Sequence, residues 1–75
     1  MTIKLVSIDD VFPSAYNPRI ADIKRLDLIE LSLRKLGFVS PIIADANGEI
    51  LSGHQRHLVA KERLGLTHVP VLYTE

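Results

Sequence analysis

The chain has 75 residues and no cysteine, and its nine basic and nine acidic residues give a formal net charge of zero. This length predicts one small domain, residues 1–75, and the ordinary apolar and charged fractions argue against disorder. The lack of cysteine excludes a disulfide, a thiolate nucleophile and a cysteine-based zinc site, and it fits a reducing cytoplasm.

Charge and hydropathy limit the partners that we expect. A DNA-binding domain usually carries a basic excess, so we expect DNA contact only indirectly or through a domain outside these residues. No apolar run approaches the roughly 18 residues of a membrane span, and the N-terminus lacks the apolar core of a signal peptide. We therefore expect a cytoplasmic protein without membrane contact, either complete as it stands or part of a longer chain.

The N-terminal third predicts a strand, a loop and a helix. Residues 3–8 have the β-branched content of a strand, and Pro13 prevents the ladder from continuing. The following loop contains Asn17-Pro18-Arg19, in which the proline restricts the direction taken by Arg19. A helix is expected from about Asp22, with Gly37 as its left-handed C-terminal residue.

One face of this first helix is apolar and is expected to face the core. Its members share a helical spacing and are Leu26, Ile29, Leu33 and Leu36. Leu28 and Leu31 lie off this stripe, either because the helix is covered on two sides or because they contact a partner. A homodimer through Leu28 and Leu31 is one form of that second alternative.

The remainder predicts a hairpin, a second helix and a last strand. Strands over 42–45 and 49–51 flank Asn47-Gly48, a strong signal for a type I′ turn. A helix over 53–64 and a strand over 68–73 follow, with Pro70 indicating an edge strand or a strand start. The predicted fold class is α+β, a β-α-β-β-α-β domain whose helices cover one face of a mixed sheet.

The segment from Ser52 to His57 predicts an anion-binding turn. Ser52 and Gln55 fit the capping box of a helix start, and Gly53 lets a ligand approach the backbone. The helix N-terminus favours an anion, and Arg56 supplies a guanidinium suited to phosphate. His54 is expected to donate a hydrogen bond to phosphate; with His57 it could instead form a weak metal pair or an acid–base group.

Several segments together resemble the ParB/sulfiredoxin superfamily, and most closely the ParB N-terminal (ParB-like nuclease) domains. They are Asn17-Pro18-Arg19, residues 33–42, residues 48–56, residues 60–65 and Val69-Pro70-Val71. The resemblance implies a small α/β fold that binds nucleotide phosphates at the strand-to-helix turn. It implies phosphate contacts from Ser52, Gly53, His54, Gln55 and Arg56, and a second phosphate or base contact from Arg19, which could otherwise tie its loop to the sheet.

The members of the superfamily differ from one another, and from this chain, in the sequence of the turn itself. Partition ParB proteins carry G-E-R-R and bind CTP, whereas His54 and Gln55 stand here for the glutamate and the first arginine. Sulfiredoxin carries G-C-H-R, and His54 replaces its reactive cysteine. Free serine kinases of the superfamily carry a G-H-x-R-like turn, with acidic residues for which Asp9 and Asp10 are candidates.

Three functions follow as expectations. The first is a nucleotide-binding module of a DNA-associated regulator of partition, phage or DNA-modification type, binding CTP or ATP with Mg²⁺. The second is a small ATP- or ADP-dependent phosphotransferase or a nuclease, which needs a base and usually Mg²⁺ near the phosphate. The third is a non-catalytic interaction domain, supported by the missing first arginine of the motif.

Overall fold

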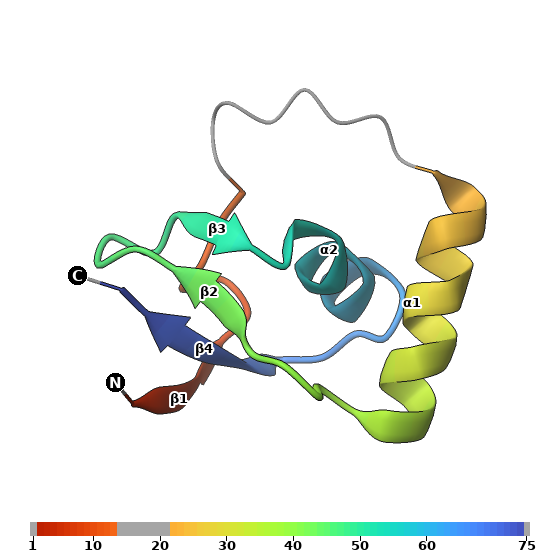
Figure 1. Ribbon diagram of the computed structural model, residues 1–75, viewed down its shortest axis with the longest axis horizontal. Helices are drawn as coiled ribbons and strands as arrows, with labels where there is room; N and C mark the ends of the chain where they lie inside the picture. The colour runs from red at the N-terminus through yellow and green to blue at the C-terminus, as the bar shows by residue number, and fades with distance from the viewer. Residues whose placement is uncertain (1, 14–21, 75) are drawn as a thin grey trace.

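A computed structural model describes residues 2–13 and 22–74, and these form two helices and one four-stranded sheet (Figure 1). The elements are β1 Ile3–Ser7, α1 Ile23–Leu36, β2 Ile42–Ala44, β3 Ile50–Ser52, α2 His54–Glu62 and β4 His68–Tyr73. The strand order is β1-β4-β2-β3, with β2 and β4 parallel and the outer pairs antiparallel. The predicted α+β class, element order and mixed sheet are therefore confirmed.

Pro70 does not lie on an edge strand or at a strand start, so that prediction was wrong. It sits inside β4, which lies between β1 and β2 and pairs Pro70 with Leu5. Antiparallel pairs alternate between bonded and non-bonded, and the bond from Ile8 N to Thr67 O fixes the Leu5–Pro70 pair as non-bonded. The ladder to β2 begins only at Val71, so the missing amide of Pro70 costs no sheet hydrogen bond.

The core lies between the sheet and α2. Buried side chains of the sheet and its flanking turn meet α2 at Ala60; they are Ile8, Val11, Ile42, Ala44, Ile50, Val69 and Val71. A second cluster joins α1 to α2 through Leu26, Leu33 and Val59. Figure 1 shows the resulting arrangement, in which α2 lies between the sheet and α1. Thus α1 reaches the core chiefly by packing on α2.

Helix α1 begins and ends as its sequence predicts. The Asp22 carboxylate accepts the amides of Lys24 and Arg25, at 3.1 and 3.5 Å, and Gly37 closes the helix with a φ of +69°. Leu36 was expected on the core face but is 70% exposed, so that placement was wrong. Leu33 of the same last turn packs in the cluster that joins α1 to α2, whereas Leu36 does not belong to that cluster.

The turn between β2 and β3 is not type I′. That turn needs a positive φ at two successive residues, and here Gly48 alone has one, at +96°. Asp45 O accepts the Gly48 amide, while the Asp45 carboxylate accepts the amides of Asn47 and Glu49. The Asp45 carboxylate therefore holds the turn by an Asx-type bond.

Candidate phosphate-binding turn at the start of α2

The chain passes from β3 into α2 through a glycine in the left-handed region. Gly53 is the N-cap, with φ +99° and ψ +22°, and no side chain of the described residues caps the helix. The predicted capping box was therefore wrong. Ser52 stays in β3, exposed and paired with Ile43, and Gln55 bonds elsewhere. A left-handed N-cap turns the chain before a serine side chain can reach back over the first turn.

Glycine is required at this position by space as well as by backbone angle. A Cβ on Gly53 would lie 3.0 Å from Arg56 Nη2 and 3.3 Å from Ile42 Cγ1. Its left-handed backbone would also strain any other residue. The bare backbone thus lies directly beside the guanidinium of Arg56.

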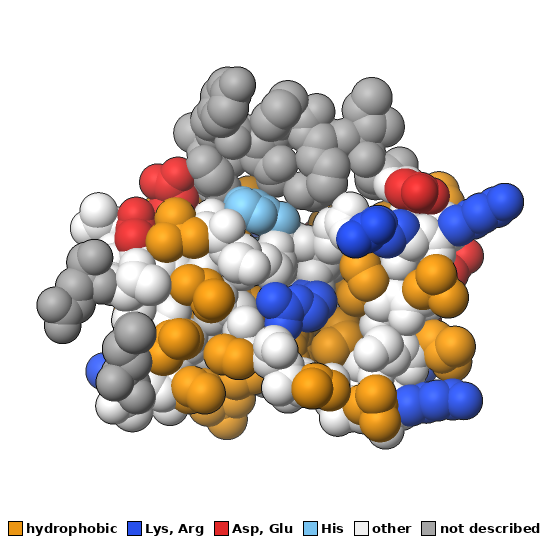
Figure 2. Space-filling view, in the orientation of Figure 1, with side chains coloured by type: hydrophobic (Ala, Val, Ile, Leu, Met, Phe, Trp, Pro, Cys, Tyr) orange, Lys and Arg blue, Asp and Glu red, His pale blue; other side chains and the backbone are white. Residues whose placement is uncertain are grey.

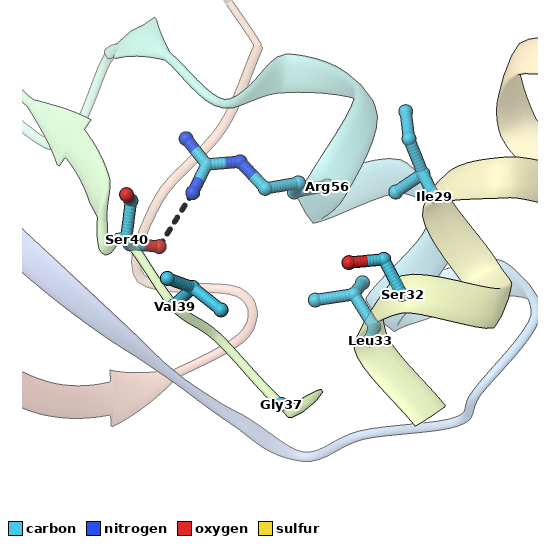
Figure 3. Close-up of a pocket in the computed structure, with 7 residues that line it drawn as sticks. All are labelled: Ile29, Ser32, Leu33, Gly37, Val39, Ser40 and Arg56. Carbon is cyan, nitrogen blue, oxygen red and sulfur yellow. Dashed lines mark hydrogen bonds between the residues drawn. The ribbon is translucent and has the colours of Figure 1, made fainter. Parts of the chain in front are cut away.

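Arg56 reaches from α2 to the loop before β2. Its Nη1 donates to the carbonyl of Ser40 at 2.5 Å, which ties the helix start to the sheet. Figure 3 shows this bond on one side of a cavity, with Ile29, Ser32 and Leu33 projecting from α1 on the other. The cavity has a volume of about 300 Å³, at the small end of ligand pockets. Its lining is apolar apart from two serines and this guanidinium.

Gln55 contacts α1 in place of its own helix cap. Its Oε1 accepts a hydrogen bond from Arg25 Nε at 3.0 Å, which brings a second arginine to the first turn of α2. Nothing in the sequence motif pointed to Arg25, because it lies thirty residues earlier in the chain. Only the packing of α1 against α2 places the two side chains together.

The two histidines of α2 have different surroundings. His57 is 5% exposed, and its Nε2 lies 2.9 Å from the Ile8 carbonyl, so it links α2 to the end of β1. His54 lines a separate cavity of about 160 Å³ with Pro13 and Lys61. Within residues 2–13 and 22–74, no group of three or more potential ligands is arranged to hold a metal ion. The contact of His57 is that of a structural side chain.

The described contacts of Asp9 and Asp10 lie away from the turn. Asp9 forms an ion pair with Lys61 at 3.2 Å, and Asp10 lines an open cavity beside β1. Arg19, with its Asn17-Pro18 neighbours, lies outside the described residues, so its role stays a prediction. Neither described helix is long and apolar enough to cross a membrane.

Charge is distributed unevenly among the four arginines in the described part of the chain. Arg34 pairs with Glu30 at 3.0 Å, and Arg63 pairs with Asp27 and Glu30 at 2.6 and 3.2 Å. The hydrogen bond to Asp27 raises the pKa of Arg63 above its ordinary value. Within residues 2–13 and 22–74, by contrast, the side chains of Arg25 and Arg56 bond only to neutral oxygens. In Figure 2, Lys and Arg side chains lie in the middle of the face shown and over the nearby end of α1.

Comparison with known proteins identifies relatives for this fold. No protein-family model matches the chain. The ParB-like nuclease domain-containing protein YnaK of Escherichia coli K12 is 31% identical over 65 residues, covering 87% of this chain and 74% of that protein. An uncharacterized protein, ORF326b of Acidianus two-tailed virus, is 44% identical over 46 residues, covering 61% of this chain and 14% of the viral protein.

The comparison with solved structures gives the same family as the comparison with curated proteins. A pNOB8-like ParB N-domain superposes with a TM-score of 0.77 and 32% identity, over 96% of this chain and 28% of that one. ParB from Caulobacter crescentus, complexed with CTP-γ-S, gives 0.84 at 24% identity, over 100% and 45%. Sulfiredoxin from Arabidopsis thaliana gives 0.84 at 19% identity, over 100% and 86%. The chain thus spans less than half of either ParB chain. It belongs to the ParB/sulfiredoxin superfamily, among the ParB-like domains.

Proposed function

We propose that this chain is a nucleotide-binding module and that the first turn of α2 holds the nucleotide phosphates. The observation that carries the proposal is the uncapped, left-handed Gly53 beside a guanidinium that has no carboxylate partner among the described residues. Backbone amides at a helix start and an unneutralised arginine both favour an anion with several oxygens.

The residues have separate parts in this proposal. Gly53 lets a phosphate approach the backbone, and the backbone amides at the positive end of the helix are its proposed hydrogen-bond donors. Arg56 keeps its bond to Ser40 and uses its other N–H groups on the phosphate. Ser52, at the end of β3, adds a contact to the phosphates. Arg19, which precedes α1 in the sequence, adds another.

The nucleotide is proposed to be CTP or ATP, accompanied by Mg²⁺. CTP has the support of the Caulobacter crescentus ParB structure, which has the same fold and was solved with CTP-γ-S. The cavity beside Arg56 is of a size to take a base or a sugar, and α1 lines it with Ile29, Leu33 and Ser32. Such a domain would report nucleotide binding to a DNA-associated cytoplasmic protein, with DNA bound by other segments.

Isothermal titration with CTP, ATP, ADP and GTP in the presence of Mg²⁺ tests this proposal. Arg56→Ala should weaken binding about ten-fold or more, since a hydrogen-bonded charge pair is lost. Arg34→Ala is the control, because it removes an equal charge from α1 at a residue already paired with Glu30. Wild-type binding that Arg56→Ala leaves unchanged would refute the role of Arg56. A flat titration with all four nucleotides would favour an interaction domain.

Leu28 and Leu31 are proposed as the surface that contacts a second copy of the chain. They are 67% and 51% exposed on α1, away from the side packed against α2. Two exposed leucines on one helix are an apolar feature that a partner would cover. Sedimentation equilibrium of wild type and Leu28→Ser/Leu31→Ser tests this: a dimer that persists in the double variant contradicts it.

A further inference from the structure

Arg25 is the only arginine outside α2 that the described structure brings to the turn. Its Nε donates to Gln55 Oε1, so the guanidinium is held at the second residue of α2 by a bond across the two helices. The bond uses one of five N–H groups, and the acceptor is a neutral amide. Within the described residues the charge of Arg25 therefore meets no carboxylate.

The pairing pattern of the arginines separates structural cations from available ones. Arg34 is neutralised by Glu30 within α1. Arg63, at the end of α2, is neutralised by Asp27 and Glu30 of α1. The two guanidiniums that meet no carboxylate among the described residues both contact the first turn of α2 or its N-cap, Arg25 at Gln55 and Arg56 beside Gly53. Two cations near one helix start favour an anion that can contact both of them.

We infer that Arg25 is the second phosphate-binding arginine of this site, and that Gln55 positions it. The inference rests on the proposed phosphate turn and extends it to a ligand class. Two guanidiniums near one helix start suit a chain of phosphates, so the site should select a di- or triphosphate over a monophosphate. Residue 55 of α2 is a glutamine and carries no charge of its own. Its side chain instead holds the Arg25 guanidinium, which comes from α1, at that position.

The test compares Arg25→Ala with wild type by titration against inorganic tripolyphosphate, CTP, ATP and CMP. The variant keeps the backbone amide of residue 25, which donates to the capping carboxylate of Asp22. The Arg25 side chain is exposed, so the fold should persist. We expect about ten-fold weaker binding of tripolyphosphate and of both triphosphates, with a clearly smaller change for CMP. Arg34→Ala on the same helix should bind as wild type does.

A rescue variant distinguishes a ligand contact from a merely structural role. Arg25→Ala/Gln55→Arg moves the guanidinium from α1 to α2 and should recover most of the lost affinity for tripolyphosphate. Gln55→Ala alone should cause a partial loss, because Arg25 keeps its charge but loses its anchor. Thermal denaturation of each variant monitors folding.

Each outcome decides the inference. If wild type binds and Arg25→Ala binds equally well, Arg25 has no part in the site and the inference fails while the phosphate turn stands. A loss that the rescue variant does not restore would make Arg25 a structural residue and also overturn the inference. If wild type binds neither tripolyphosphate nor any nucleotide, the proposed function fails together with it.

Discussion

Substituting Gly53 by alanine probes the geometry of the turn most sharply. Alanine at a φ of +99° carries the strain of the left-handed region, about 1–2 kcal/mol. Its Cβ would also press on Ile42 at 3.3 Å and displace Arg56, whose Nη2 would lie at 3.0 Å. We expect a total loss of about 2–3 kcal/mol in the free energy of unfolding. That corresponds to a fall of roughly 8–24 °C in Tm for a domain of this size.

Gly65→Ala is the matched control for this experiment. Gly65 also has a positive φ, +63°, but a Cβ there would meet nothing within 4 Å. Gly65→Ala should therefore lose only the contribution of backbone strain, about 1 kcal/mol of the free energy of unfolding, and should bind nucleotide as wild type does. Circular dichroism melting and titration with CTP measure both quantities. The reasoning is refuted if Gly53→Ala is as stable as Gly65→Ala and keeps wild-type affinity.

Two further predictions concern buried and paired groups. His57→Leu leaves the Ile8 carbonyl without its partner and should lower the free energy of unfolding in urea by about 1–3 kcal/mol, while added zinc stabilises neither protein; zinc stabilisation of wild type alone would contradict this. Hydrogen bonds from Arg34 and then Arg63 hold the pKa of Glu30 below its ordinary value of 4.5. The unfolded chain therefore binds that proton first, so the stabilisation is complete above pH 4.5 and is lost as the pH falls further. Tm measured against pH should drop less steeply in this range for Glu30→Gln, and identical profiles would contradict the assignment.

The parts of the fold that the sequence predicts are those set by local spacing. The strand over residues 3–8, the Asp22 and Gly37 ends of α1 and the start of α2 after Gly53 all follow from neighbours within a few residues. Pro70 and Leu36 were misplaced because strand order and the extent of α2 decide their surroundings, and neither is a local property.

The candidate site divides in the same way. The proximity of Gly53 and Arg56 follows from three residues of helix spacing, and the structure shows it. The cap predicted from Ser52 failed because the left-handed backbone at Gly53, rather than a side chain, makes the turn. Arg25 could not be found from the motif, because its contact with Gln55 depends on how α1 packs against α2.

The measurement that tests the phosphate turn most directly is an NMR titration of ¹⁵N-labelled protein with CTP and with ATP in the presence of Mg²⁺. The account predicts the largest shifts at the backbone amides of residues 53–56 and at the Nε groups of Arg25 and Arg56. It predicts small changes around Lys4 and Tyr73, which line the open cavity beside β1. Saturable binding whose largest shifts lie at that second cavity, or no shifts with either nucleotide, would contradict it.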